Sequence, residues 1–247
     1  NEVTPEQLPW FAQLADFVCD GLDEVGYVYC PGGIMAKTEQ WRQPLATWQD
    51  TVRKWTRSPT PDAVMRVSIF FDIRCIYGER ELAGALQETM LEQASRNSIF
   101  LAALAANALD SRPPLGIFRR FVVDRDGEHR SELDLKKRGV LPVTEIVRLH
   151  ALAHGISAVN TEERLNALAA DKHLTIAGSR NLADALHFLQ QLRIKHQCEQ
   201  IVKGQQVSNF LNPRDLPKMA KEQLRDAFTI IDEAQSSVRQ TYRAGMG

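Results

Sequence analysis

From Pro142 to the end of the chain, apolar side chains recur at the spacing of one face of an α-helix. Polar residues fill the positions between them, so each predicted helix has one face to bury. Several such helices, joined by short connections, are typical of an antiparallel helical bundle. The apolar positions that define the two longest of these helices are Leu182, Leu186, Leu189 and Leu192, and Leu224, Phe228, Ile231, Val238 and Tyr242.

The region before the bundle mixes helical patterns with short apolar segments. Residues 4–27 and 38–55 are predicted to be helices, and Trp41, Trp48 and Trp55 stand one heptad apart on the second. Aromatic residues at this spacing usually pack into a core. A surface on which a base could stack is the alternative.

Two short segments of this region have β-strand character. Tyr27–Cys30 is followed by Pro31-Gly32-Gly33, which is either a glycine-rich turn or a backbone cradle for phosphate. The second segment is apolar and β-branched around residues 68–73. Residues 79–110 then read as one long, well-buried helix.

A second part of the chain is predicted to begin near Pro113-Pro114. After it, residues 118–136 resemble a β-hairpin, with Asp126-Gly127 as its turn. The remaining residues are the predicted bundle. The sequence contains no internal repeat or low-complexity tract that would suggest another organisation.

Composition excludes several classes of protein. The 247 residues carry a net charge of -1, and no basic run is present, which disfavours nucleic-acid binding. No apolar stretch is long enough to span a membrane. The four cysteines are scattered, as expected of reduced thiols in a cytoplasmic protein.

Two pairs of residues could carry chemistry. His150 and His154 have the i, i+4 spacing of a helical metal pair, but no third ligand is evident, and ordinary helix histidines are the simpler interpretation. Asp72 and Arg74 alternate with apolar residues, so on a strand both would project from one face. There they could hold a metal-bound phosphate, or pair with each other at the rim of a sheet.

Two further polar sets lie later in the chain. Glu132, Asp134 and Lys136 would share one strand face, as a solvated surface or as the wall of a cleft. The second set has side chains suited to recognising a base or a phosphate, although a charged helix end is ordinarily solvated. Its members are Arg193, Lys195, His196, Gln197, Gln200 and Asn209.

Several segments in a fixed order resemble one family, the nucleotidyltransferases whose C-terminal part is a helical substrate-binding domain. They include "GYVYCPGGIMAKTEQW", "SIFFDIRCIYGERELAGAL", "LDLKKRGVLPVTEIVRLHALAHGI", "TEERL", "LRIKHQ" and "SNFLNPRDL". The resemblance covers nearly the whole chain. It implies a bacterial signal-transduction protein related to protein-PII uridylyltransferase, often with cyclic-nucleotide-binding and CBS domains upstream.

The resemblance also implies a polymerase-β-like site. In that superfamily a Gly-Ser turn binds the nucleoside triphosphate, and an Asp-x-Asp strand holds two Mg²⁺ ions that bridge the phosphates. This segment is expected just before Pro5 and does not occur in the sequence. The chain is therefore interpreted as a C-terminal fragment that is inactive alone, with Mg²⁺ needed only by the intact protein.

Individual roles follow from the matched positions. A third carboxylate is expected on the Tyr27–Cys30 strand, which offers none, so Asp72 is the nearest substitute as a catalytic and metal-binding residue. With triphosphate binding assigned upstream, the Gly32-Gly33 stretch is more simply a turn. The predicted substrate- or nucleotide-binding residues are Arg74, Asp134, Lys136, Arg193, His196 and Asn209.

The resulting prediction is a mostly helical α+β protein. Residues 1–95 would be the C-terminal part of an α/β nucleotidyltransferase domain, and residues 96–247 a helical substrate-binding domain. The bundle would present an acceptor, either a protein or a small molecule. The alternative is a non-catalytic regulatory module that binds a ligand or partner beside a degenerate transferase half. A homodimer is left open.

Overall fold

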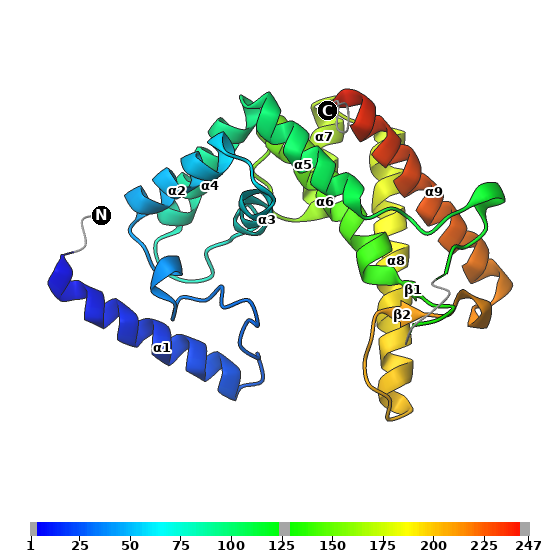
Figure 1. Ribbon diagram of the computed structural model, residues 1–247, viewed down its shortest axis with the longest axis horizontal. Helices are drawn as coiled ribbons and strands as arrows, with labels where there is room; N and C mark the ends of the chain where they lie inside the picture. Colours follow the sequence, from blue (N-terminus) through cyan, green and yellow to red (C-terminus); the bar gives the residue numbers. More distant parts are fainter. Residues whose placement is uncertain (1–3, 124–128, 243–247) are drawn as a thin grey trace.

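The computed structural model describes residues 4–123 and 129–242. Its helices follow one another along a curved, arch-like path, with α1 at one end and the long helices α8 and α9 at the other (Figure 1). The sheet of the described chain has two strands, β1 and β2. The prediction of a mostly helical α+β fold is confirmed.

The first predicted helix is confirmed as α1, Leu8–Glu24, which follows a 3₁₀ turn at Pro5–Gln7. Gly26 ends it with a φ of +103°, a conformation that glycine adopts without strain. The strand predicted at Tyr27–Cys30 is wrong, because these residues belong to no strand or helix. An isolated strand needs a hydrogen-bonding neighbour, and the Tyr29 amide instead donates to Asp23 Oδ1, 3.3 Å away.

The second predicted helix is shorter than expected. It consists of a 3₁₀ turn at Glu39–Trp41 and the helix α2, Leu45–Arg57, because Pro44 cannot continue a helix that started before it. The predicted core packing is confirmed for Trp48 and Trp55, whose rings lie 4.5 and 5.7 Å from the Phe70 ring and pack against the core. Trp41 lies in the turn before α2 and stacks on Trp48 and Phe70.

Helix α3, Pro61–Phe70, replaces the strand that was predicted around residues 68–73. Thr60 caps the helix by accepting a hydrogen bond from the Ala63 amide, and Pro61 occupies the first helical position. These start signals and the burial of Val64 and Val67 on one face outweigh the β-propensity of the apolar run. Asp72 and Arg74 therefore do not alternate along a strand.

The long helix predicted over residues 79–110 is two helices, α4 (Arg80–Ser95) and α5 (Ser98–Asp110). Asn97 separates them, because its side chain accepts a hydrogen bond from the Phe100 amide and so starts a new helix. The prediction that this stretch is well buried holds for Met90 and Phe100 in the core.

The predicted hairpin over residues 118–136 is also wrong in its pairing. Strand β1, Leu133–Asp134, pairs antiparallel with β2, Phe210–Leu211, far along the chain. Asp126-Gly127 lies outside the described residues. After β1 the chain turns at once into a π-helix, Lys136–Val140, so Glu132, Asp134 and Lys136 do not share a strand face.

The predicted bundle is confirmed as α6 (Leu141–Ala153), α7 (Thr161–Ala170), α8 (Ile176–Val202) and α9 (Lys218–Thr241). Asn160 and Thr175 cap α7 and α8 with side-chain oxygens. Helices α8 and α9 pack together along one side of the bundle. Their predicted apolar faces meet in the core, including Leu186, Leu189, Phe228 and Ile231.

One hydrophobic core runs from α2 and α3 through α5 and α6 to α9. The division at residues 95 and 96 therefore stays a prediction. Among the described residues, no helix is both long and apolar enough to cross a membrane.

Candidate functional site

The predicted site residues occupy two separate places in the structure. Asp72 and Arg74 follow α3, whereas Asp134, Lys136, Arg193, His196 and Asn209 belong to the β1–β2 pair, the segments beside it and α8. Figure 1 shows α3 in the middle of the arch and the two strands low beside α8.

Asp72 is the centre of an ion-pair cluster that links α3 to the bundle. Arg148 of α6 donates to Asp72 Oδ2 from Nε at 3.2 Å and from Nη2 at 2.5 Å. Arg164 of α7 brings its Nη2 to 2.8 Å from Asp72 Oδ1, as a close ion pair rather than an aligned hydrogen bond. Both carboxylate oxygens are thus occupied by guanidinium groups.

The surroundings hold the two arginines in place. Arg164 is only 1% exposed, its Nε donates to the Ala158 carbonyl, and its guanidinium lies 4.5 Å from the Phe71 ring centre. Burial lowers the pKa of Arg164, which Asp72 opposes. Burial also works against the charged form of Arg148, but Asp72 and Glu145 raise the pKa of Arg148 above its usual value.

A polar cavity of about 480 Å³ opens beside this cluster, between α3, α5 and α6. We call it the Asp72 cavity. It is lined by Met65, Ser68, Ile69, Asp72, Asn107, Ala108, Asp110, Ser111, Leu141, Pro142, Glu145 and Arg148. Arg74, by contrast, is exposed and makes no ion pair with a described residue.

The second group of predicted residues is built around the short sheet. Asp134 Oδ1 accepts hydrogen bonds from the Lys136 and Lys137 amides at 3.0 and 2.8 Å, which caps the π-helix, and the Lys136 side chain is exposed. His196 Nε2 lies 2.8 Å from the Phe210 carbonyl and so donates to it. The carbonyl of Asn209 accepts from the Leu135 amide.

Most polar atoms of this group therefore hold the β1–β2 region together. Gln197 donates to Asn209 Oδ1 at 3.3 Å, which ties α8 to the segment before β2. Arg193 is half-buried, and its Nε has no hydrogen-bond partner among the described residues. The binding roles assigned to Asp134, Lys136, Arg193, His196 and Asn209 stay predictions.

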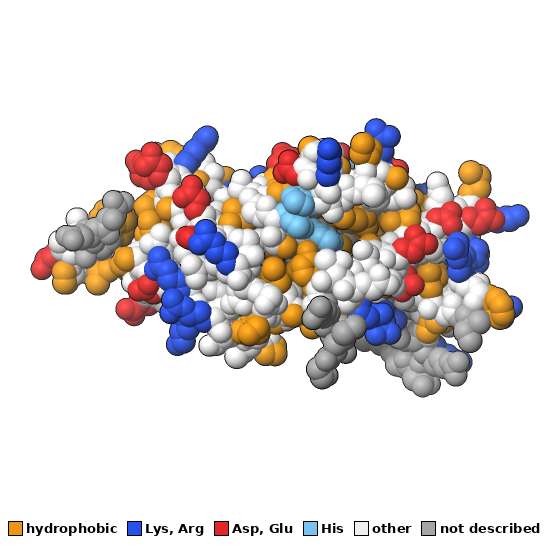
Figure 2. All heavy atoms as spheres, turned by 90° about the horizontal axis from the view of Figure 1, so that it is seen from above, with side chains coloured by type: hydrophobic (Ala, Val, Ile, Leu, Met, Phe, Trp, Pro, Cys, Tyr) orange, Lys and Arg blue, Asp and Glu red, His pale blue; other side chains and the backbone are white. Residues whose placement is uncertain are grey.

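The histidines of α6 form a third cluster. Tyr242 Oη lies 3.1 Å from His150 Nδ1, and the His154 ring stacks on His173 with centroids 3.6 Å apart. Figure 2 shows histidine side chains gathered near the middle of one face. Burial, aided by His154 and His173, lowers the pKa of His150 to about 4. No group of described residues has the three ligands of a metal site, which favours ordinary helix histidines.

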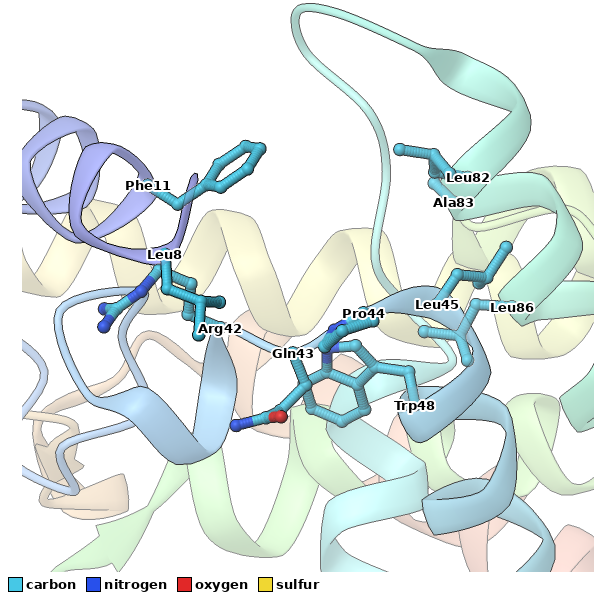
Figure 3. A pocket seen from close by; sticks show the side chains of 10 residues that line it. All are labelled: Leu8, Phe11, Arg42, Gln43, Pro44, Leu45, Trp48, Leu82, Ala83 and Leu86. Carbon is cyan, nitrogen blue, oxygen red and sulfur yellow. The ribbon is translucent and has the colours of Figure 1, made fainter. Parts of the chain in front are cut away.

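An apolar groove of about 350 Å³ separates α1 from α2 and α4. Figure 3 shows Leu8 and Phe11 of α1 on one side, Leu82 and Leu86 of α4 on the other, and Trp48 at the base. Helix α1 packs extensively against no other helix of the described chain. Helix α1 has exposed apolar residues at helical spacing: Leu14, Phe17, Val18 and Leu22.

Comparison with family models places the chain among known proteins. A model described as "putative nucleotidyltransferase substrate binding domain" matches residues 98–242, which is more than half of the chain. The chain belongs to this family. A second model, described as a "putative nucleotidyltransferase", matches residues 1–62. No curated protein and no solved structure matches.

The nucleotidyltransferase substrate-binding family model spans α5 to α9, so it contains Arg148, Arg164 and the β1–β2 region. Asp72 lies between the two matched segments. The arginines were not singled out from the sequence. Their signal was present in the quoted segments "EIVRLH" and "TEERL", but sequence spacing does not indicate that both reach Asp72.

The described residues do not fit a magnesium site. Magnesium binding by Asp72 would require a carboxylate oxygen that is free of guanidinium groups, and neither oxygen is. The described residues also offer no group of three or more acids, histidines or cysteines placed for a metal. The geometry favours an ion-pairing role for Asp72, and its catalytic role stays a prediction.

Proposed function

We propose that this chain forms the acceptor-binding side of a nucleotidyltransferase. The observation that carries the proposal is the match of residues 98–242 to the substrate-binding family, next to a nucleotidyltransferase match over residues 1–62. In this proposal the acceptor, a protein or a small molecule, binds the helical bundle. The nucleoside triphosphate and Mg²⁺ are bound by a Gly-Ser…Asp-x-Asp segment of a longer protein.

The exposed face of α1 supports the assignment of nucleotide binding to a segment outside this chain. Contiguous exposed apolar side chains usually mark an interaction surface, and α1 lies within the segment matched by the nucleotidyltransferase model. We propose that the remainder of the nucleotidyltransferase domain covers this face and the groove in Figure 3.

The finer assignments are carried by the sequence resemblance. They are a relation to protein-PII uridylyltransferase, a place in bacterial signal transduction with CBS or cyclic-nucleotide-binding domains, and a cytoplasmic location. Of the predicted binding residues, Arg74 and Lys136 are exposed, whereas Arg193 is half-buried.

A non-catalytic regulatory module is the second candidate. Two observations favour it. The carboxylate proposed to serve the reaction, Asp72, is held by Arg148 and Arg164, and the Tyr27–Cys30 segment contains no acid. In this case the bundle binds a ligand or partner, and the transferase half has lost its chemistry.

Nucleotide transfer by the longer protein discriminates between the two candidates. The longer protein is incubated with each labelled nucleoside triphosphate, Mg²⁺ and a lysate, and modified acceptors are sought. We expect labelling by the longer protein and none by residues 1–247. Absence of labelling, despite an intact Gly-Ser…Asp-x-Asp segment upstream, would favour the regulatory module.

Asp72→Asn tests the predicted catalytic residue, with Asp50→Asn on the exposed face of α2 as the matched control. If Asp72 serves the reaction, labelling is lost in protein that is still folded, whereas Asp50→Asn retains it. Full labelling by folded Asp72→Asn protein would remove Asp72 from the catalytic residues.

A further inference from the structure

The C-terminal end of α8 carries an exposed apolar stripe. Ile194, Ile201 and Val202 are 54%, 63% and 87% exposed. Cys198, which is also exposed, lies between them along the helix. Positions three, four or seven residues apart lie on one side of a helix, so these four side chains form a single surface. We call this surface the α8 face.

The other side of the same helix end is covered within the chain. His196 Nε2 donates to the Phe210 carbonyl at 2.8 Å, and Gln200 Nε2 donates to Ser208 Oγ at 3.0 Å. These bonds hold the helix end against the segment that leads into β2. Figure 1 shows this end of α8 extending beyond the two strands. The α8 face is therefore an outward-facing surface on a helix end that is held in place from behind.

Two opposite charges flank the α8 face. At about 100° per residue, Lys195 and Glu199 fall on the same edge of the stripe. Both side chains are exposed, and neither forms an ion pair with another described residue. A Lys that precedes a Glu by four residues is the less favourable order for pairing along one helix. The two charges are thus better placed to pair with a partner than with each other.

The pattern of the α8 face is complementary to itself. If two copies of α8 pack antiparallel, with a two-fold axis beside residues 197 and 198, Ile194 of each copy lies opposite Ile201 of the other. In the same arrangement Lys195 lies within one residue's rise of Glu199 of the other copy, and symmetry repeats the pair. The apolar contacts and both ion pairs therefore form in one register.

We propose that the α8 face is a homodimer contact in which the α8 ends of two chains pack antiparallel. Burial of Ile194, Ile201 and Val202 from both chains supplies the driving force. The crossed pairs of Lys195 and Glu199 select a second copy over an unrelated apolar surface. Two helix ends bury less surface than a standard interface of about 1,200–2,000 Å², so the dimer forms only as the protein concentration rises.

This inference goes beyond the proposed function. Helix α1, the proposed contact for the remainder of the nucleotidyltransferase domain, lies at the other end of the arch (Figure 1). The dimer requires only the 247-residue chain. A monomeric chain would leave the proposed transferase function standing, and a failure of nucleotide transfer would leave the dimer standing.

Sedimentation velocity of the full chain at rising concentrations, under reducing conditions, tests the contact. We expect the wild-type protein to shift from monomer to dimer. Ile194→Glu should abolish the dimer, because it puts a charge from each chain into the apolar contact. Ile176→Glu, the matched control at the other end of α8, replaces a residue that is 62% exposed and should leave the dimer unchanged. A wild-type chain that stays monomeric, or a dimer that persists in Ile194→Glu, would overturn the proposal.

A charge reversal tests whether the partner is a second copy in the antiparallel register. Lys195→Glu sets like charges against each other and should weaken the dimer about tenfold, since two exposed ion pairs become repulsive. Adding Glu199→Lys restores both pairs with their signs exchanged and should restore the wild-type affinity. Thermal unfolding checks the fold of each variant. Wild-type affinity in Lys195→Glu, or no recovery in the double variant, would contradict the antiparallel pairing.

Cys198 gives an independent readout of distance. When the two helix axes are about 8–10 Å apart, the Cys198 Cα atoms of the antiparallel pair lie within reach of a disulfide. A chain that keeps only Cys198, with the other cysteines replaced by serine, should be cross-linked by the thiol oxidant diamide about tenfold faster than one that keeps only the exposed Cys30. Equal rates of cross-linking in the two chains would contradict the contact.

Discussion

Helices α1 and α9 both carry apolar residues at helical spacing, but only those of α9 are buried in the structure. In α9, Phe228 and Ile231 are fully buried against α8 and the rest of the core. In α1, Phe17 is 78% exposed and its apolar neighbours are also uncovered. Periodicity therefore predicts that a face must be covered, but not that the covering residues belong to the same chain.

The largest expected difference between the two helices is in stability. Phe228→Ala should lower the free energy of unfolding by about 4 kcal/mol, because it leaves a cavity in the core. Phe17→Ala, the matched control on α1, should change it by less than about 0.5 kcal/mol, since surface substitutions rarely do more. Urea denaturation of both variants measures the difference. A loss of several kcal/mol in Phe17→Ala would show that the α1 face is covered within this chain.

The pH dependence of the free energy of unfolding tests the burial of His150 in the bundle. Because the pKa of His150 is about 4 in the folded protein and 6.5 for an unperturbed histidine, the unfolded chain binds a proton between these pH values that the folded chain does not. The contribution of His150 to the free energy of unfolding is therefore fully present above pH 6.5 and is lost as the pH falls. Between pH 7 and pH 5 the contribution of His150 should fall by about 2 kcal/mol.

Denaturation at several pH values measures this loss. His150→Gln should reduce the slope, whereas His187→Gln, an exposed histidine on α8, should leave it unchanged. An identical pH dependence in the wild-type and His150→Gln proteins would contradict the assignment of the slope to His150.

The sequence predicts the bundle well because apolar spacing alone determines which faces of α6 to α9 are buried. It fails where local and tertiary signals compete. The apolar run at residues 68–73 has β-propensity, but Thr60 and Pro61 start a helix, and one face of that helix packs into the core. Likewise Leu133–Asp134 pairs with Phe210–Leu211 rather than with a neighbour, and no local pattern contains that partner.

The candidate site shows the same limit. Asp72 was found from its residue type and the family resemblance, but its partners Arg148 and Arg164 come from two different helices of the bundle. Only the packing of α3 on α5, of α5 on α6 and of α6 on α7 brings the three side chains together. Both roles considered for the Asp72 and Arg74 pair, phosphate binding and mutual pairing, depend on a strand that does not form.

We infer that Asp72, which follows α3, is energetically coupled to Arg164 of α7 and so joins the region before the bundle to the bundle itself. A double-mutant cycle of Asp72→Asn and Arg164→Met, followed by urea denaturation, measures that coupling directly. We predict that the double variant loses about 1.5 kcal/mol less free energy of unfolding than the two single variants lose together. The reason is that each single substitution leaves a charge without its partner. Additivity of the two losses to within about 0.5 kcal/mol would contradict the claim.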